Sequence, residues 1–294
     1  MFQLFPLARA VGFRSRAATV IAGSLGLTGF LGLATLMSAH AVAGEWPSKV
    51  EATYTVSFNG FNIGDFKFRA HVGPRGYSLD GDAQISALLG VVNWRGLTRS
   101  TGRVAKRRPS PDGYVFNFRS GNKGGAIKLG FEGERVTRVD QRPQLPVKPG
   151  EIPLKPSHLK GVLDPLSAVM AMTKPKSRNP CEQTLKVFDG KQRFNLALSY
   201  KKQEAVGQLR TAGQPGIAIV CAISYQPISG YTPSAETHRL SQGQALEIAL
   251  RPVPGADMYI PHEIRISTMA GPVRLTANQI HITTGRERIA LVTR

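Results

Sequence analysis

Hydrophobic and polar side chains alternate along most of the chain after residue 49. Over residues 50–58 every second side chain is apolar, and glutamate, threonine or serine stands between them. The same alternation returns over residues 66–72. Because successive side chains of a strand point to opposite faces of a sheet, this period of two predicts antiparallel strands with one buried and one solvated face.

Alternating runs recur through the rest of the chain and are separated by glycine- and proline-containing turn signals, one of them at residues 111–113. The runs occupy residues 77–86, 114–118, 127–131, 185–187, 194–200, 217–225, 246–250, 260–266 and 273–282. In the last run the apolar parity shifts between Ala277 and Ile280, which predicts a β-bulge.

Two dipeptides between alternating runs predict tight hairpins. Asn59-Gly60 and Asp189-Gly190 are both preferred in type I′ turns, where the two central residues have positive φ. Asp189 could instead be a catalytic carboxylate, but its place before a glycine between two strands favours the turn.

One helix is expected in an otherwise strand-rich chain. Five prolines over residues 141–156 predict a crossing loop. After it, Asp164 is suited to the N-cap and Pro165 to the first helical position of a helix over residues 165–173. Four of its side chains share one stripe, which we expect to pack on the apolar face of the sheet: Leu166, Val169, Met170 and Thr173.

These elements predict an all-β fold in one domain over residues 44–294. Long antiparallel strands should curl into an open or partly closed barrel, with one short helix, because a flat sheet of this size would twist and expose its edges.

Residues 1–43 are interpreted as a signal peptide. Three arginines open this segment, residues 17–37 carry no charge, and Ala41-Val42-Ala43 fits the small-x-small pattern of signal-peptidase cleavage. This interpretation predicts export and a periplasmic location. The alternative is an uncleaved membrane anchor, because the uncharged run is long enough to span a bilayer.

The formal net charge of +19 favours anionic partners, such as an envelope lipid or polymer. The basic residues are spread over short groups: Lys106-Arg107-Arg108, Lys174 with Lys176 and Arg178, and Lys201-Lys202. No nucleic-acid-binding motif accompanies them, so no nucleic-acid partner is expected. A basic surface that is merely solvated would have the same composition.

Cys181 and Cys221 are the only two cysteines, and each has the parity of the apolar residues in its run. In an exported chain such a pair predicts a disulfide. A metal pair or a free nucleophile is the alternative, but no histidine stands at ligand spacing. No metal or other cofactor is therefore predicted.

Motifs of known catalytic chemistry are absent from the sequence. Ser120 and Ser157 begin S-x-x-K matches, but one lies in a glycine-rich turn and the other in the proline-rich loop. Asp80 and Asp82 share the polar face of one run and could act as acid and base on a glycoside. Carboxylates so placed more often meet lysines across the sheet. No catalytic residue is predicted.

Several segments resemble a bacterial exported family, the domain of unknown function 3108. They are "YTVSFNGFNIGDFKF", "DPLSAVMAM" from Asp164, the cysteine at Cys181, "VFDGKQRFNL" from Val187 and "CAISYQPISGY" from Cys221. The resemblance covers roughly residues 50–282. It implies a periplasmic, strand-rich protein and supplies no catalytic residues.

Three functions are compatible with these patterns. We expect a non-catalytic envelope protein that binds a lipid, another apolar ligand or a protein partner at the inner wall of the barrel. The alternatives are a hydrolase of envelope polymers that uses Asp80 and Asp82, and a structural scaffold without a ligand.

Overall fold

The computed structural model describes residues 46–87, 92–105, 107–144, 146–206, 216–254, 256–285 and 287–292. The signal peptide predicted over residues 1–43 lies outside this part of the chain. Within the described ranges, no helix has both the length and the apolar character that crossing a bilayer requires.

The described strands form one 14-stranded sheet in which neighbouring strands are antiparallel. The first seven are β1 (Lys49–Phe58), β2 (Phe61–Gly73), β3 (Gly76–Ala87), β4 (Val92–Ala105), β5 (Arg108–Ser120), β6 (Lys123–Glu132) and β7 (Arg135–Arg142). The other seven are β8 (Gln183–Phe188), β9 (Arg193–Val206), β10 (Gly216–Ser229), β11 (Leu246–Pro252), β12 (Tyr259–Thr268), β13 (Gly271–Thr283) and β14 (Arg288–Val292).

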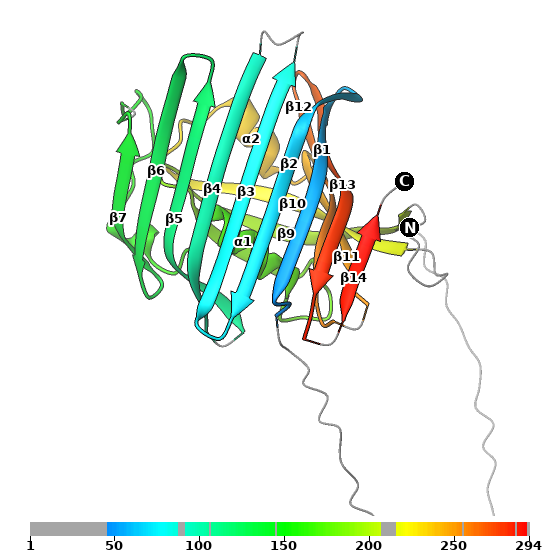
Figure 1. The fold of residues 1–294 in the computed structure, drawn as a ribbon. Helices are drawn as coiled ribbons and strands as arrows, with labels where there is room; N and C mark the ends of the chain where they lie inside the picture. The colour runs from blue at the N-terminus through cyan, green and yellow to red at the C-terminus, as the bar shows by residue number, and fades with distance from the viewer. Residues whose placement is uncertain are drawn as a thin grey trace, which may run out of the picture. The chain divides into compact units, whose positions relative to one another are not determined.

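Two meanders are joined side by side. The strand order is β7-β6-β5-β4-β3-β2-β1-β13-β12-β11-β10-β9-β8, with β14 paired to β13. Figure 1 shows β7 to β1 as one row of strands, with β9 and β10 running behind them. The all-β class with a curled, unclosed sheet is therefore confirmed.

Helix α1 (Pro165–Thr173) lies between the two halves of the sheet. It contacts β3, β4 and β5 on one side and β8 and β12 on the other. Leu166 and Met170 belong to the larger core cluster, which includes residues of β1 to β3, β5 to β7 and β12 to β14, whereas Ala168 and Met172 pack in a second cluster with β8 to β11. The predicted helix range is confirmed, but the stripe opposite the predicted one is also buried, because the second half of the sheet covers it.

The two outer strands of the sheet, β7 and β8, do not pair with each other, but a short segment links them. Lys160 forms an isolated bridge with Arg135 of β7, and Leu163 forms one with Val187 of β8. The amide of Leu163 donates to the carbonyl of Lys186 at 2.9 Å, and the amide of Phe188 donates to the carbonyl of Leu163 at the same distance. Residues 160–163 therefore cover this corner of the open sheet.

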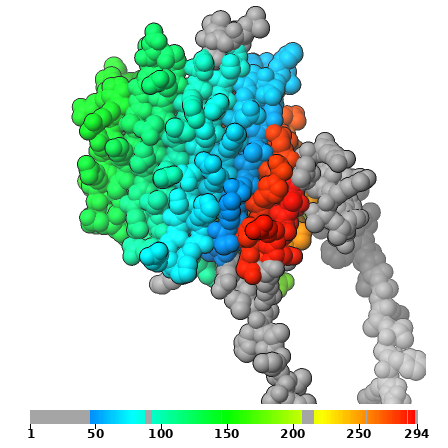
Figure 2. Space-filling view, in the orientation of Figure 1, coloured from blue at the N-terminus to red at the C-terminus, as the bar shows by residue number. Residues whose placement is uncertain are grey.

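The outer face of the first half is solvated, as the alternation predicts. In β1, Val50, Ala52 and Tyr54 are buried, and the residues between them are partly exposed. Figure 2 shows this outer face as one continuous surface from β7 to β13. The parity shift predicted in β13 is present too: Thr53 pairs with Gln279 and Tyr54 with Ala277, which leaves one extra residue in β13.

Three elements differ from the sequence-based expectation. A second helix, α2 (Ala235–Ser241), is present; it buries none of its residues and so has no apolar stripe to reveal it. A short 3₁₀-helix, η2 (Pro156–Leu159), follows the proline-rich loop. β4 has no predicted counterpart, because its buried inner positions are glycine and serine: Gly96, Ser100 and Gly102.

The turn predicted at residues 111–113 is wrong, because β5 runs through it. Thr101 pairs with Gly113 and Gly102 with Pro111, so Asp112 is the extra residue of a β-bulge. A bulge accommodates the same proline and glycine without ending the strand.

The two predicted hairpin turns have different geometries. Asn59 and Gly60 have φ of 49° and 84° and join Phe58 directly to Phe61, which is a type I′ turn. At Asp189-Gly190 a type I′ turn is not formed, because Asp189 lacks a positive φ. Residues 189–192 instead form a four-residue loop.

The side chain of Asp189 holds that loop together. Its Oδ1 accepts hydrogen bonds from the amides of Lys191 at 2.8 Å and Gln192 at 2.7 Å. Burial raises the pKa of this carboxyl, against the effect of the backbone hydrogen bonds. Asp189 therefore has a structural role in the loop.

Candidate functional site

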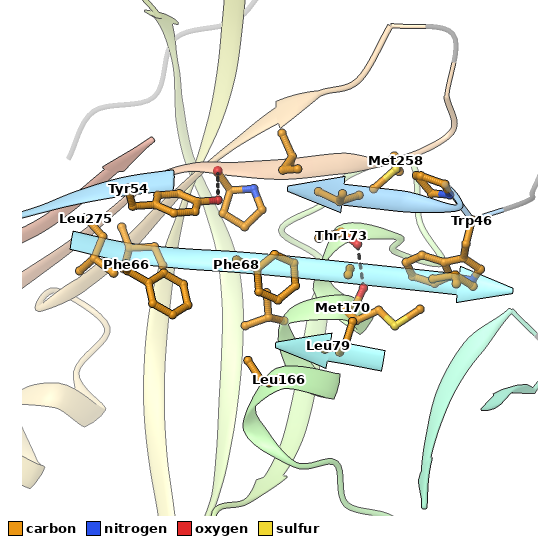
Figure 3. Close-up of a pocket in the computed structure, with 18 residues that line it drawn as sticks. Trp46, Tyr54, Phe66, Phe68, Leu79, Leu166, Met170, Thr173, Met258 and Leu275 are labelled. Carbon is orange, nitrogen blue, oxygen red and sulfur yellow. Dashed lines mark hydrogen bonds between the residues drawn. The ribbon is translucent and has the colours of Figure 1, made fainter. Parts of the chain in front are cut away.

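An apolar trough separates the inner face of the first strands from helix α1 and strands β12 and β13 (Figure 3). Its walls are formed by Trp46, Pro47, Val50, Tyr54, Phe66, Phe68, Ala70, Val72, Leu79, Leu166, Val169, Met170, Thr173, Met258, Ile260, Pro261, Ile264 and Leu275. All four residues of the predicted helix stripe are among them.

The trough is long and narrow. Four alternate residues of β2, from Phe66 to Val72, line it, and at about 3.4 Å per residue they span about 20 Å. Figure 3 shows Phe66 and Leu275 toward one end and Trp46 and Met258 at the other. Such a shape fits a chain better than a compact molecule.

The free volume is small. The centre of a water molecule can occupy about 100 Å³ of the trough. One water molecule needs roughly 10–15 Å³ of such space for its centre, and it fills about 30 Å³ in the liquid. The trough therefore has room for a liquid volume of about 200–300 Å³. That is enough for part of one hydrocarbon chain but not for a whole lipid.

The polar atoms of the lining are mostly engaged within the protein. The hydroxyl of Tyr54 donates to the carbonyl of Pro261 at 2.9 Å, and that of Thr173 donates to the carbonyl of Met170 at 2.8 Å. Burial raises the pKa of Tyr54 far above its usual value, so the phenol stays neutral. Among the described residues, the buried Nε1 of Trp46 has no hydrogen-bond partner. The trough is therefore a water-repelling surface with one unused donor near its Trp46 end.

A buried polar network fixes the beginning of α1 against β3 and β4. Asp164 is the N-cap, and its Oδ1 accepts from the amides of Leu166 and Ser167, each at 3.0 Å. Ser100 of β4 donates to Oδ2 of Asp164 at 2.9 Å and lies 2.9 Å from the hydroxyl of Ser167, which lies 2.7 Å from that of Tyr77.

Each hydroxyl has one proton, so the network has one direction. Because Ser100 donates to Asp164, Ser167 must donate to Ser100 and Tyr77 to Ser167. Burial raises the pKa of Asp164, against the opposing effect of these hydrogen bonds. The sequence analysis identified the cap but missed the three hydroxyl groups; Ser100, a polar residue at an inward position of β4, is the signal that could have revealed the network.

A disulfide secures the segment that follows α1. Cys181 and Cys221 are bonded, with their Cα atoms 5.3 Å apart. Cys181 lies between α1 and β8, Cys221 lies in β10, and both are fully buried. The Asp164 cap therefore holds the start of the helix that forms one wall of the trough, and the bridge ties the segment after that helix to β10.

Asp80 and Asp82 lie away from the trough, on the solvated face of β3. Asp80 pairs with Arg99 at 2.6 Å and Asp82 with Arg95 at 3.0 Å. Their salt-bridge partners are thus arginines of β4 rather than lysines, although Lys67 of β2 lies directly opposite Asp82. Each carboxylate is paired with its own arginine, and neither aspartate lines the trough.

The described residues contain no cluster of three or more histidine, cysteine, aspartate or glutamate side chains that could hold a metal ion.

Part of the site was visible in the alternation and part was not. The apolar faces of β1 and β2 supply Val50, Tyr54, Phe66 and Phe68, all on predicted strands. Trp46 and Met258 were missed, because they stand outside the alternating runs and only the fold brings them to the trough.

A comparison with family models finds one match: a family described as "Protein of unknown function (DUF3108)" matches residues 53–278. No curated protein and no solved structure matches the chain.

Proposed function

The chain belongs to the DUF3108 family, whose description assigns no activity, and we propose from the trough that the protein binds a hydrocarbon chain, such as the acyl chain of an envelope lipid, without catalysis. The observation that carries this proposal is the narrow apolar trough of about 20 Å between β1, β2 and α1. Its length and small cross-section favour a chain-shaped ligand.

The free energy of binding such a ligand comes from the removal of apolar surface from water. Each methylene group that leaves water contributes roughly 0.8 kcal/mol. An apolar cavity of this kind stays dry and accepts apolar molecules. The hydroxyls of Tyr54 and Thr173 already donate to backbone carbonyls, so a hydrocarbon chain in the trough would not break their hydrogen bonds.

We also propose that the protein acts outside the cytoplasm, in the periplasm. The disulfide between Cys181 and Cys221 supports this location, since disulfides persist in oxidising compartments. The segment interpreted as a signal peptide supports it as well. Detection of the processed protein in a periplasmic extract, with its amino terminus after Ala43, tests the location.

The test of binding is a series of straight-chain alcohols from six to fourteen carbons, titrated into the purified domain by calorimetry. Each added methylene should lower Kd about fourfold, which is 0.8 kcal/mol, until the trough is full and the affinity stops increasing. An affinity independent of chain length would overturn the proposal.

A matched pair of variants locates the binding. Val169, half-buried on α1, lines the trough, whereas Val139 of β7 is 44% exposed. Val169→Trp should fill the trough and weaken binding more than tenfold, while Val139→Trp should leave it unchanged. Both variants must retain the circular dichroism spectrum of the parent for the comparison to count. Equal binding by both variants would place the chain elsewhere.

The alternative functions give other results in the same experiments. A hydrolase that uses Asp80 and Asp82 would lose its activity in Asp82→Asn, although alcohol binding would remain. A scaffold without a ligand would bind none of the alcohols. The separate pairing of each carboxylate with an arginine disfavours the hydrolase.

A further inference from the structure

A second cavity lies on the other side of the end of α1. The centre of a water molecule can occupy about 460 Å³ of it, compared with about 100 Å³ of the trough. The cavity is lined by the start of β5, residues 161–163, the segment after α1 and the start of β8. This is the corner where the sheet remains open and residues 160–163 link its outer strands. We call it the cleft.

Positive charge prevails in the cleft. Four basic residues line it: Arg108, Lys174, Lys176 and Lys186. They come from two of the basic groups that are far apart in the sequence and from β8. Two acidic residues, Glu134 and Glu182, also line it. With four cations and two carboxylates, the cleft has a formal excess of two positive charges.

Three of these cations, Arg108, Lys176 and Lys186, are exposed side chains. Within the described ranges, Arg108, Lys176 and Lys186 form no salt bridge. By contrast, Lys201 pairs with Glu247, and Lys202 pairs with Glu204 at 3.1 Å.

Glu182 is occupied by its own loop. Its carboxylate accepts from the hydroxyl of Ser177 at 2.7 Å and from the side-chain amide of Asn179 at 3.1 Å. This carboxylate of the cleft is thus engaged within its own loop, and the cleft has cationic groups available to an incoming anion.

The cleft and the trough are lined by adjacent residues at the C-terminal end of α1. Thr173 lines the trough, and Lys174, the next residue, lines the cleft. The Nζ of Lys174 lies 5.2 Å from the centre of the Trp46 ring, and Trp46 forms the end of the trough. The unused Nε1 donor of Trp46 belongs to this same junction. An amphiphile with its chain in the trough would therefore have its polar end beside Lys174.

We propose that the cleft binds the anionic headgroup of the chain-bearing ligand, and that this headgroup carries about two negative charges, as a phosphate monoester does. The inference rests on the proposed function, because it takes the trough as the site of the chain. A phosphate monoester has a charge of about −1.5 to −2 at neutral pH and three acceptor oxygens, which match the excess charge and the donors of the cleft.

The test compares three probes by calorimetry at pH 8: decyl phosphate, decanol and inorganic phosphate. Decyl phosphate should bind more tightly than decanol, and inorganic phosphate alone should bind weakly. Added salt should reduce this difference, because it screens the charged headgroup.

Two charge-reversal variants provide the matched comparison. Lys186 and Lys128 are both exposed lysines on strands without a salt bridge among the described residues, but Lys128 of β6 lies outside the cleft. Lys186→Glu should raise the Kd for decyl phosphate about fivefold or more, because one favourable charge pair is lost and an unfavourable one is gained. It should leave decanol unchanged, and Lys128→Glu should alter neither probe.

The remaining outcomes separate the two proposals. Equal affinity for decyl phosphate and decanol, or equal effects of the two lysine variants, would overturn the headgroup site and leave the chain site standing. Tight binding of inorganic phosphate that is sensitive to Lys186→Glu, without a gain from the decyl chain, would make the cleft a site for free anions and overturn the headgroup assignment. Binding of no probe would overturn both proposals.

Discussion

Replacing the buried Asp164 tests how α1 is held over the trough. Asp164 accepts three hydrogen bonds, from the amides of Leu166 and Ser167 and from the hydroxyl of Ser100. Asp164→Ala removes the N-cap, which costs about 1–2 kcal/mol. It also leaves the buried Ser100 hydroxyl without its acceptor, which costs a further 1–3 kcal/mol or so. A total loss of about 3 kcal/mol is expected, together with weaker alcohol binding.

Asp164→Asn should be far milder. Asparagine caps helices as well as aspartate does, because its Oδ1 accepts from the same amides. Its amide nitrogen can donate to Ser100, and the hydroxyl network then runs in the opposite direction, with Ser100 donating to Ser167 and Ser167 to Tyr77, which leaves the Tyr77 proton without its present acceptor. A loss of about 1 kcal/mol at pH 7 is expected, because the helix cap is kept and one buried donor loses its acceptor.

The same pair of proteins gives a pH dependence of known sign. Burial raises the pKa of Asp164 in the folded protein above 3.8. The folded state therefore holds this proton more tightly than the unfolded state. The contribution of Asp164 to stability is fully present below the unfolded pKa and is lost as the pH rises through the raised folded pKa.

Urea unfolding of the parent and Asp164→Asn at intervals from pH 3 to pH 8 measures this effect. The stability of the parent, relative to that of the asparagine variant, should fall as the pH rises above about 4. A difference that stays constant, or that grows in favour of the parent with rising pH, would refute the reasoning. The second result would mean that the helix dipole and the hydrogen bonds outweigh the cost of burying the charge.

Two further predictions concern the disulfide and the hairpin glycines. Cys181→Ser should destabilise the oxidised protein by about 4 kcal/mol, from the entropy of a loop with a sequence separation of 40; equal losses in oxidised and reduced protein, compared by urea unfolding, would contradict this. Gly60→Ala should cost about 1–2 kcal/mol, because φ is 84° while the space beside Gly60 is empty. Gly190→Ala should cost about 1–3 kcal/mol more in the same assay, because its new Cβ would lie 2.3 Å from the Cγ2 of Ile127; losses of the same size would refute the role of that contact.

Local chemistry in the sequence determined much of the scaffold. The alternation over β1 and β2 places Val50, Tyr54, Phe66 and Phe68 on one face, because a strand has a period of two. The bounds of α1 follow from a cap at Asp164 and a proline in the first turn. Each of these signals acts over a few residues, and a linear pattern can therefore reveal it.

Longer-range features were decided by the tertiary structure. The pairing of β1 with β13 joins the two meanders, and no pattern in either sequence segment indicates that these two strands are partners. The curl of the sheet buries both sides of α1, although the sequence showed only one apolar stripe. It also brings Ser100 to Asp164 and gathers Arg108, Lys174 and Lys186 in one cleft. Such contacts depend on which strands lie opposite one another, and that choice depends on the packing of the whole core rather than on the periodicity of any segment.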